Sequence, residues 1–492
     1  MHRHAIHDKG AAIEFVGRKR ELALLESEYG RNHAFVVIYG RRRVGKTKLI
    51  QRFIEGKKAL YFLTSRESEE LNRRRFAQKV AEVTGQSHIA EASFDDWRPL
   101  FQTLASFAAN ERLVIVIDEL PYLVKTNSAF PSILQGIWDE TLSQANVMLI
   151  LCGSSVSMMR DKVLSHDSPL YGRRTAQLRL KPLAFSELRE AYPMIPYKQL
   201  ASLYAITGGV PKYLEILDPA KLAACANATI ATSFFEEEIV RNVLSPSGFL
   251  YEEPYFLFAQ EGRDPASHLS LISVIAQGSR RAAEIARTTG MKESALPVYL
   301  KTLIDLGYIE REVPFNEDAP KRSKNGLYHV ADEFLTFWFR YVQPFASDLE
   351  MGNVRPSLIA LEKTFESDTV PFLFERLSRQ AFMRLCTEGK IDFQPLRVGS
   401  YWTRTSEWEL DVCAFDRNSG RAFYGECKCH KNKPFSLEEY RALVRDAASA
   451  PKRSDAEPLL GLFSTTGFDE EILRIAENHG SLILLDRDER IA

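Results

Sequence analysis

The sequence predicts an α/β protein in which a parallel sheet comes first, a small helical module follows, and a second α/β domain ends the chain. Three apolar runs, in AFVVIYG at 34–40, LVIVIDEL at 113–120 and VMLILCGSS at 147–155, have the length and composition of buried parallel strands. Short amphipathic helices are predicted between residues 268 and 312, and from residue 365 onward helical and strand-like segments follow one another. A chain of 492 residues accommodates about three domains at ~100–200 residues each.

The composition is that of an ordinary globular protein, with 45% hydrophobic and 26% charged residues. The net charge of −1 gives the whole molecule no attraction for nucleic acid, so such binding would need a local basic patch. The six cysteines are scattered, which favours free thiols in a reducing cytoplasm. Residues 1–14 lack the apolar segment of a secretory signal and are expected to form a loose tail, and no apolar run is long enough to span a membrane. We therefore expect a cytoplasmic protein.

Residues 40–47 read GRRRVGKT and match the phosphate-binding loop pattern G-x-x-x-x-G-K-[ST]. A buried apolar run precedes the pattern and the helical segment KTKLIQRFI follows it, as the pattern requires. The two glycines let backbone N–H groups surround a polyphosphate at a helix N-terminus. The lysine reaches the β and γ phosphates of ATP, and the threonine hydroxyl can hold Mg²⁺. The residues expected to bind the nucleotide through this loop are Gly40, Arg41, Arg42, Arg43, Val44, Gly45, Lys46, Thr47 and Lys48.

Polar residues follow the next two apolar runs at the point where each ends. The run at 113–118 ends in Asp118 and is followed by Glu119; the first would hold the Mg²⁺ shell and the second would polarise the attacking water. The alternative is that this acidic pair only caps the helix that begins at Pro121. Ser154 follows the third run and is the candidate contact to the γ-phosphate or the water, with a plain strand-to-loop turn as the alternative. Carboxyl ends of parallel strands meet at one edge of a sheet, so the ligand is expected there.

Three segments resemble the AAA+ and STAND-type ATPases of archaea and bacteria: FVGRKREL at 15–22, DELPYL at 118–123 and GGVPKYL at 208–214. The resemblance implies a P-loop NTPase sheet with a helical lid, a proline of the lid against the adenine, and an arginine of YGRRT that reaches a γ-phosphate. It also allows a homo-oligomer bridged by nucleotide. A solvent-exposed arginine pair is the alternative for YGRRT. The resemblance assigns Phe15, Val16, Gly17, Arg18 and Pro211 to the adenine pocket, and Arg173 or Arg174 to the arginine finger.

The ATPase domain is predicted to span residues 1–245, with its sheet ending near residue 182 and its lid at 183–245. Residues 250–345 are predicted to form a winged-helix domain, because three short amphipathic helices precede two strands joined by a polar loop. Such a module either contacts DNA or packs between domains, and both readings stay open. The aromatic stretch at 329–345 is expected to be a buried helix. The side chains that the module offers to DNA are Lys292, Ser294 and Lys301 on the third helix, and Lys321, Arg322 and Lys324 in the loop.

The last part of the chain, residues 360–492, places acidic and basic residues on two predicted neighbouring strands. Glu426 and Lys428 are two residues apart and share one face of their strand, and Asp411 on the preceding strand can lie beside Glu426. Two carboxylates and a backbone carbonyl form an oxygen-rich Mg²⁺ or Mn²⁺ site, to which Glu375 on the preceding helix can add a water-mediated ligand. The metal would activate water, and the lysine would position or polarise the nucleophile. The residues of the basic rim expected around this site are Arg397, Arg404, Lys431 and Lys433.

From residue 365 the sequence predicts a helix, three strands, a helix, a strand, a helix and a final strand. This order, with E-x-D and E-x-K on adjacent strands, resembles the α/β restriction-endonuclease-like PD-(D/E)XK fold. The full chain resembles a family of archaeal and bacterial AAA+-type ATPases that carry a winged helix and a C-terminal domain of this kind. The resemblance implies an ATP-hydrolysing protein whose nucleotide state controls a metal-dependent nuclease acting on nucleic acid, and we expect DNA and not RNA to be that nucleic acid. The alternatives are an ATP-dependent DNA-binding switch with an inactive nuclease-like domain, and a signalling ATPase that binds protein partners.

Overall fold

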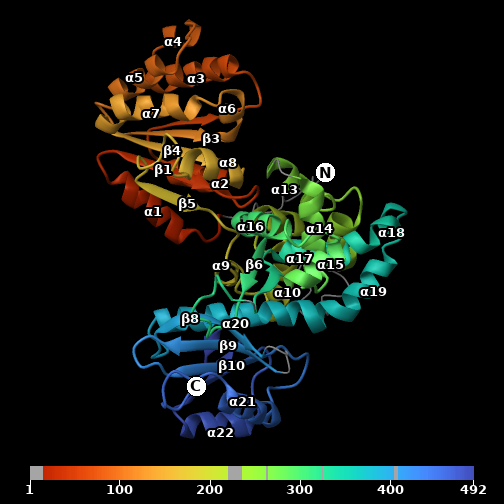
Figure 1. Cartoon of the computed structure of the whole chain (residues 1–492). Helices are drawn as coiled ribbons and strands as arrows, with labels where there is room; N and C mark the ends of the chain where they lie inside the picture. Colours follow the sequence, from red (N-terminus) through yellow and green to blue (C-terminus); the bar gives the residue numbers. More distant parts are fainter. Residues whose placement is uncertain (1–14, 220–234, 262–263, 324, 404–407) are drawn as a thin grey trace, which may run out of the picture. The chain divides into compact units, whose positions relative to one another are not determined.

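The computed structural model describes residues 15–219, 235–261, 264–323, 325–403 and 408–492. The predicted loose tail at the N-terminus lies outside these residues. The chain forms two compact units, which Figure 1 shows with the labels used below. The first unit takes in the chain up to Ala191 together with Gly209–Ile216 and Tyr255–Pro265, and the second takes in Tyr192–Gly208, Leu217–Pro254 and Ala266–Ala492.

A five-stranded parallel sheet forms the centre of the first unit, with the strand order β2-β3-β4-β1-β5. Every residue of β1, β3 and β4 is buried, as their apolar sequences predict. Two strands were not expected from the sequence: β2 is five residues long and only partly buried, and β5 is four residues long and half-exposed. The strands are β1 Ala34–Tyr39, β2 Ala59–Leu63, β3 Leu113–Asp118, β4 Val147–Gly153 and β5 Ala176–Arg179.

Helices surround this sheet, and the apolar faces of the first two pack against it. Leu25 of α1 and Leu49, Ile50 and Phe53 of α2 join the core formed by β1, β3 and β4. Burial of these side chains fixes the start of α2, which is the end of the phosphate-binding loop. The helices of this unit are α1 Lys19–Tyr29, α2 Lys46–Ile54, α3 Glu69–Thr84, α4 His88–Glu91, α5 Arg98–Phe107, α6 Pro121–Thr126, α7 Phe130–Glu140, α8 Val156–Met159, α9 Phe185–Ala191, α11 Pro211–Leu217 and α13 Glu253–Glu261, with short non-α turns η1 Leu142–Gln144 and η2 Arg160–Leu164.

The second unit begins with helical segments and contains three helices followed by an antiparallel strand pair. The helices α14, α15 and α16 and the strands β6 and β7 occur in the order expected for the module at 250–345. Lys292 and Ser294 precede α16 instead of lying on it, because Pro297 suits only the first turn of a helix. The segments in question are α10 Tyr197–Thr207, η3 Phe235–Leu244, α14 Pro265–Ala276, α15 Ala282–Thr289, α16 Leu296–Leu306, β6 Ile309–Glu312 and β7 Leu327–Val330.

The aromatic stretch forms α17 (Glu333–Tyr341), which is buried along its length, so the expectation of a buried helix is confirmed. Asp332 caps it by accepting a hydrogen bond from the Leu335 N–H at 2.9 Å. Trp338 donates its indole N–H to the Tyr251 carbonyl oxygen at 2.7 Å. The next segments are η4 Gln343–Phe345, α18 Ala346–Glu350, α19 Arg355–Thr364, η5 Phe365–Thr369 and α20 Val370–Thr387.

A six-stranded mixed sheet, in the order β13-β12-β11-β10-β9-β8, follows α20. The strands β8, β9 and β10 are antiparallel, and β10, β11 and β12 are parallel because helices connect them. Every predicted element is present, and the two-residue strand β13 is an addition. These elements are β8 Pro395–Trp402, β9 Glu409–Asp416, β10 Ala422–Lys428, α21 Leu437–Ser449, β11 Leu459–Ser464, α22 Glu470–Asn478, β12 Leu482–Asp486 and β13 Glu489–Arg490.

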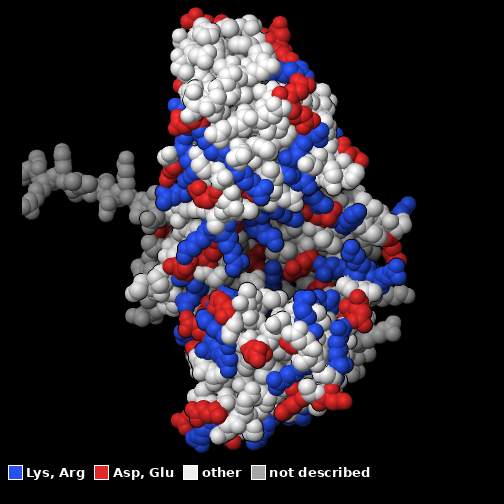
Figure 2. Space-filling model, turned by 90° about the vertical axis from the view of Figure 1, so that its left-hand side faces the viewer, with Lys and Arg blue, Asp and Glu red and all other residues white. Residues whose placement is uncertain are grey.

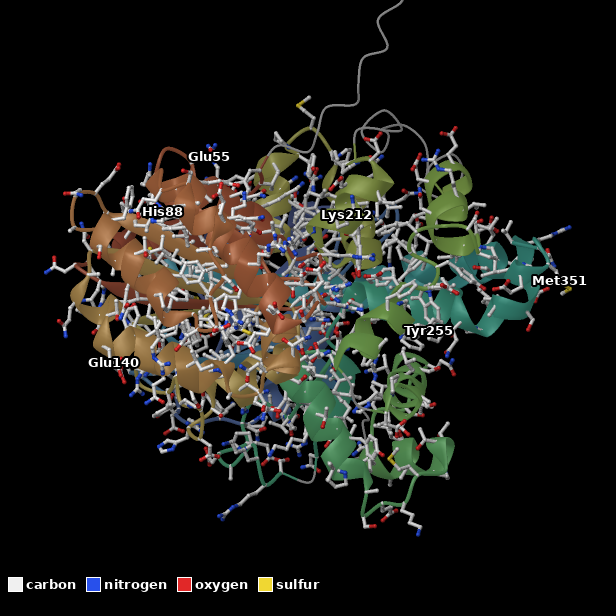
Figure 3. All side chains as sticks on the ribbon, turned by 90° about the horizontal axis from the view of Figure 1, so that it is seen from above. Glu55, His88, Glu140, Lys212, Tyr255 and Met351 are labelled. Carbon is white, nitrogen blue, oxygen red and sulfur yellow. The ribbon has the colours of Figure 1, made fainter. Side chains whose placement is uncertain are left out.

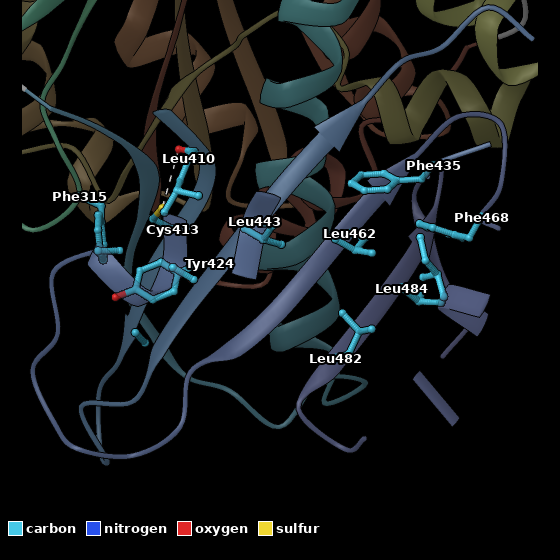
Figure 4. Close-up of a cluster of buried hydrophobic side chains, with 14 of the residues drawn as sticks. Phe315, Leu410, Cys413, Tyr424, Phe435, Leu443, Leu462, Phe468, Leu482 and Leu484 are labelled. Carbon is cyan, nitrogen blue, oxygen red and sulfur yellow. Dashed lines mark hydrogen bonds between the residues drawn. The ribbon is translucent and has the colours of Figure 1, made fainter. Parts of the chain in front are cut away.

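The loop after β6 is anchored in the core of this C-terminal sheet. Phe315 is buried beside Leu410, Cys413 and Tyr424 (Figure 4), and its ring centroid lies 4.6 Å from that of Phe415. The Phe315 N–H donates to the Ser400 carbonyl oxygen of β8 at 3.0 Å. The predicted wing therefore shares a hydrophobic core with the C-terminal sheet.

The predicted domain boundaries do not coincide with the two units. Helix α10, expected in the lid of the ATPase domain, belongs to the second unit, whereas most of α13, expected in the winged-helix domain, belongs to the first. The reason is packing: α10 lies against α17 and α20. Among the residues that the structure describes, no helix combines the length and the apolar character needed to cross a membrane.

Candidate functional site

The phosphate-binding loop connects β1 to α2 at the carboxyl edge of the sheet. A Cβ atom at Gly40 would overlap the Leu180 carbonyl oxygen, and Gly45 has a φ of 91°, so both positions require glycine. The Cβ position of Gly45 lies 3.7 Å from Cγ of Pro211, which brings the predicted adenine-pocket proline against the loop. The loop and the helix N-terminus thus have the backbone form of an anion site.

Lys46 is buried and its ammonium group lies inside the loop. The Nζ atom donates to the carbonyl oxygens of Gly40 at 2.8 Å and Arg41 at 2.9 Å. A phosphate placed in the loop would offer charged acceptors in place of these neutral ones, which makes the stronger bond. The side chain is therefore already directed at the phosphate position.

Asp118 ends β3 with its carboxylate beside the start of α2. Its Oδ2 atom accepts the Thr47 hydroxyl at 2.9 Å and the Tyr61 hydroxyl at 2.5 Å, and only 1% of the residue is exposed. Burial, with the Asp118 charge next, raises the pKa of Tyr61, so this hydroxyl stays a donor. The oxygens of Thr47 and Asp118 lie side by side, and oxygen ligands of this kind are those that Mg²⁺ takes. These two residues therefore fit the magnesium position expected from the sequence.

Glu119 is held by the end of the neighbouring strand β4. Its Oε2 atom accepts the Ser154 hydroxyl at 2.8 Å and the Ser154 N–H at 3.3 Å. The sheet order β3-β4-β1 explains the contact, because it places the end of β4 between Asp118–Glu119 and the phosphate-binding loop. Glu119 also has a φ of 55°, a left-handed conformation that costs a non-glycine residue roughly 1–2 kcal/mol and that is concentrated at functional sites.

The segment expected to line the adenine pocket starts at residue 15, where the described chain begins. Within it, Arg18 stabilises the phosphate-binding loop. Its Nη2 atom donates to the carbonyl oxygens of Val44 at 2.9 Å and Lys181 at 2.6 Å, so it ties the phosphate-binding loop to the chain after β5. The Arg18 N–H donates to Glu187 at 2.8 Å. Phe15, Val16 and Gly17 precede it, and adenine contact by this segment stays a prediction.

The other arginines near the site have protein partners. Arg42 donates to the Tyr122 hydroxyl at 2.8 Å, and the Arg41 guanidinium lies 6.0 Å from the Tyr213 ring centroid. Arg173 makes a two-pronged contact with Asp139 of α7, at 2.8 Å from Nε and 2.7 Å from Nη2, and Arg174 lies over the Tyr171 ring. Arg173 would have to leave Asp139 to act as a finger.

In the C-terminal sheet, Asp411 of β9 and Glu426 of β10 face each other. The register pairs Gly425 with Val412, so one further step along it sets Glu426 opposite Asp411. The Cys427 N–H donates to Asp411 Oδ2 at 2.8 Å, and Lys428 Nζ contacts Glu426 Oε1 at 2.6 Å. The structure therefore brings together the three residues expected from the E-x-D and E-x-K patterns.

The carboxyl groups of this cluster resist ionisation. Burial, with the Asp411 charge next, raises the pKa of Glu426 to about 7, and burial raises the pKa of Asp411 to about 6. Burial and the Asp411 charge also raise the pKa of Glu375 well above its usual value. These shifts mark carboxyl groups that are buried close to one another, and a cation bound beside them would favour their ionised forms.

Among the described residues, no group of three or more His, Cys, Asp or Glu side chains converges closely enough to enclose a metal ion. Glu375 therefore does not complete a three-carboxylate cage with Asp411 and Glu426. Mg²⁺ keeps several of its waters and needs only one or two carboxylates, so the facing pair alone suits a hydrated ion of this type.

The basic rim expected around this cluster is not a set of free cations. Arg397 donates to the Pro314 carbonyl oxygen at 2.6 Å, Lys431 lies 3.6 Å from Glu366, and Lys433 lies 3.6 Å from Glu439. Arg404, like Lys324 of the predicted wing, lies outside the described residues. Basic side chains are numerous on the face drawn in Figure 2, but acidic side chains are interspersed among them.

Comparison with known proteins identifies the family. Residues 15–217 match an ATPase domain found predominantly in Archaea, and residues 338–441 match archaeal and bacterial proteins of unknown function. An uncharacterised protein of Methanocaldococcus jannaschii is 34% identical over 433 residues, which is 88% of this chain and 91% of that protein. This chain belongs to that family of archaeal-type P-loop ATPases.

Two solved structures are also similar to this P-loop ATPase. A Walker-type ATPase of Pyrococcus abyssi is 18% identical and covers 66% of this chain and 96% of its own, with a TM-score of 0.48. A signal transduction ATPase with numerous domains and a tetratricopeptide repeat sensor, from Pyrococcus horikoshii, is 18% identical and covers 76% of this chain and 52% of its own, with a TM-score of 0.31.

The ATPase contains functional contacts that the sequence does not reveal. Tyr61 places a hydroxyl group in the otherwise apolar strand β2. That hydroxyl was the one signal in the sequence for its contact with Asp118. Glu261 of α13 contacts the start of α8 directly after Ser154: its carboxylate accepts the N–H groups of Val156 at 3.1 Å and Ser157 at 3.0 Å, and the Ser157 hydroxyl at 2.7 Å. No pattern connects two positions about a hundred residues apart, so only the fold reveals this contact. Tyr255, at the exposed side of α13, is labelled in Figure 3.

We expect Glu261→Ala to slow ATP hydrolysis several-fold, with little change in nucleotide affinity. The substitution leaves the Val156 and Ser157 N–H groups without their acceptor, which costs about 1–3 kcal/mol and loosens the segment that carries Ser154. Steady-state hydrolysis and ATP titration of the same preparation measure the two effects. Glu252→Ala, at an exposed position on the same stretch of chain, is the matched control. Wild-type turnover in Glu261→Ala would show that this contact is only structural.

Proposed function

We propose that the P-loop ATPase uses ATP binding and hydrolysis to control a metal-dependent nuclease-like reaction of the C-terminal domain on nucleic acid, with DNA as the favoured substrate. The observation that carries the proposal is the facing pair Asp411 and Glu426 beside Lys428, in the same chain as a phosphate-binding loop with its acidic strand end.

In the ATPase site, Lys46 would exchange its two backbone carbonyl partners for the β and γ phosphates. The exchange replaces neutral acceptors by charged ones and costs little reorganisation, because the ammonium group is already in the loop. Thr47 and Asp118 would hold Mg²⁺, which supplies positive charge against the phosphate oxygens when bound.

Glu119 would act as the base for the attacking water. In the structure its Oε2 atom accepts hydrogen bonds from the hydroxyl and the N–H of Ser154, which hold the carboxylate at the end of β4. A γ-phosphate at the end of β4 would compete for the Ser154 hydroxyl and thereby release Glu119. Ser154 thus makes the base dependent on the presence of the terminal phosphate.

In the C-terminal domain, Asp411 and Glu426 would hold one divalent cation, and Lys428 would lie next to it. The ion would lower the pKa of a bound water and stabilise charge on a phosphate. Lys428 is positioned by its 2.6 Å contact with Glu426, and burial of the pair strengthens that contact. The Cys427 N–H fixes the Asp411 carboxylate from the other side.

A second candidate function is an ATP-driven DNA-binding switch whose nuclease-like domain is inactive. Two observations favour it: Glu375 does not join the facing pair in a metal cage among the described residues, and Arg397, Lys431 and Lys433, the described members of the expected basic rim, already contact protein groups. The two candidates differ in whether the facing carboxylates bind metal.

We expect Mg²⁺ or Mn²⁺, added without nucleotide at pH 8, to raise the melting temperature of the wild-type chain by a few degrees and to leave Glu426→Ala unchanged. At this pH both carboxylates are ionised and repel each other, and a bound cation relieves that repulsion; an ion at a hundred times its Kd stabilises by about 2.7 kcal/mol. Thermal unfolding curves at increasing metal concentration make the measurement. Glu438→Ala, at an exposed position of α21, is the control. Equal shifts of the melting temperature in wild type and Glu426→Ala would contradict metal binding by Asp411 and Glu426.

A further inference from the structure

A cavity of about 250 Å³ lies in the second unit, bounded by the β6–β7 hairpin, α20 and the strands β8 and β9. Arg280 and His329 of the helical module line it together with Arg379 and Trp402 of the C-terminal domain, and four carboxyl groups, those of Glu312, Asp368, Glu375 and Glu409, share the lining. Glu409 lines the cavity and lies two residues before Asp411 on β9. The cavity is therefore next to the carboxylate pair but not part of it.

Two buried nitrogen atoms on the cavity wall lack hydrogen-bond partners within the described part of the chain. They are Nε1 of Trp402 and Nε2 of His329, and these residues are only 5% and 6% exposed. The nearest acceptor to His329 is Glu312 Oε2 at 3.6 Å, which is too far for a hydrogen bond. Buried polar atoms are rarely left unpaired, and an exception calls for a missing partner.

A cationic and aromatic surface completes the wall. The Arg280 guanidinium lies over the Phe372 ring at 5.1 Å, and the His329 ring lies 5.4 Å from the same Phe372 ring. The structure gives the Arg280 side chain no ion pair with any described residue. Arg379, by contrast, is occupied, because it contacts Glu312 at 2.5 Å and thereby neutralises one acidic group of the cavity.

The unsatisfied groups select the chemistry of a ligand. The Arg280 guanidinium and the Trp402 indole N–H are donors only and need acceptors such as phosphate oxygens, whereas the carboxyl groups of Asp368, Glu375 and Glu409 can accept hydrogen bonds from the amino groups of a base. Flat aromatic and guanidinium faces stack on nucleobases, and arginine is the preferred partner of a phosphate group. A cavity of about 250 Å³ has room for one nucleotide and not for a duplex.

We propose that this cavity receives a single unpaired nucleotide of a DNA strand, with its phosphate at Arg280 and its base against the aromatic wall formed by Phe372, His329 and Trp402. The proposal rests on the proposed function, and it adds the substrate class: single-stranded, frayed or extruded nucleotides instead of intact duplex. It also assigns a role to the helical module, because Arg280 and His329 complete a site that the C-terminal domain alone lacks.

The test is binding of a fluorescent single-stranded DNA and of a blunt-ended duplex of the same sequence to the full-length chain, in Ca²⁺ to limit cleavage. We expect the single strand to bind more tightly, and Arg280→Ala to weaken that binding roughly tenfold. Trp402→Phe keeps the ring, removes the N–H, and should weaken binding by about fivefold. Arg287→Ala, at an exposed position of neighbouring α15, should bind as the wild type does.

The outcomes separate this proposal from the proposed function. Equal affinity for single strand and duplex, with Arg280→Ala binding like the wild type, would overturn the cavity assignment while leaving a DNA-binding protein. Absence of binding to either form by the wild-type chain would overturn both. Single-strand binding should also change the tryptophan fluorescence of the wild type more than that of Trp402→Phe, and Arg280→Ala decides the matter if Trp402→Phe does not fold.

Discussion

Lys46→Ala is expected to abolish ATP hydrolysis. Lys46 is the cation that the structure places inside the phosphate-binding loop, 2.8 Å from the Gly40 carbonyl oxygen and 2.9 Å from that of Arg41. Removal of a single preorganised charge-stabilising group typically costs about 10²–10³ in rate, and the loss of phosphate affinity adds to it. Phosphate release at saturating ATP, with direct titration of nucleotide binding, measures both effects.

Arg52→Ala is the control for Lys46→Ala. Arg52 also belongs to α2, but it is exposed and pairs with Glu55 at 2.6 Å, away from the loop. We expect this variant to hydrolyse ATP at the wild-type rate. Wild-type hydrolysis by Lys46→Ala would contradict the assignment of the nucleotide site.

Glu119→Gln is expected to bind ATP normally and to hydrolyse it about 10²–10⁴ times more slowly, which is the usual contribution of a general base. The amide oxygen of glutamine can still accept the Ser154 hydroxyl, so the local structure persists while the basic oxygen is lost. Single-turnover hydrolysis beside equilibrium ATP binding separates the two properties.

Glu140→Gln, at the exposed end of α7 (Figure 3), is the matched control and should leave both properties unchanged. If Glu119→Gln lost ATP affinity to the same extent as turnover, Glu119 would be a structural residue. The proposed release of a catalytic base from Ser154 would then be wrong.

Parts of the molecule whose chemistry is local were predictable from the sequence. The phosphate-binding loop needs two glycines, a lysine and a threonine within eight positions. The strands β1, β3 and β4 can be recognised in the sequence because burial on both faces requires apolar side chains along their length. Asp411, Glu426 and Lys428 were predictable for a related reason: alternation along a strand and pairing of adjacent strands fix which side chains meet.

Parts that depend on long-range packing were not predictable. Phe315 reads as the end of a wing strand, yet it is buried in the C-terminal core, and Arg397 reads as a rim cation, yet it donates to a backbone carbonyl. Helix α10 was expected in the lid, but nearly all of its residues are buried, and its partners α17 and α20 are more than a hundred residues away. The sequence of a helix can show that it is packed and not what it is packed against.

The contact between Glu119 and Ser154 also could not be predicted from the sequence. Each residue was a candidate on its own, because each follows a buried strand. Their hydrogen bond depends on the sheet order, in which β4 lies between β3 and β1, and strand order is not written in any local pattern. The dependence of the base on a terminal phosphate therefore emerges only from the fold.

DNA cleavage by Glu119→Gln tests most directly whether the nucleotide state of the ATPase controls the C-terminal domain. The measurement is the rate of cleavage of labelled single-stranded DNA in Mg²⁺, with ATP, with ADP and without nucleotide, for wild type, Glu119→Gln and Glu426→Ala. We predict that cleavage by Glu119→Gln, which retains ATP, stays at the level that wild type shows only while ATP lasts, and that Glu426→Ala does not cleave. Cleavage that is identical in all three nucleotide conditions, or that persists in Glu426→Ala, would contradict the account.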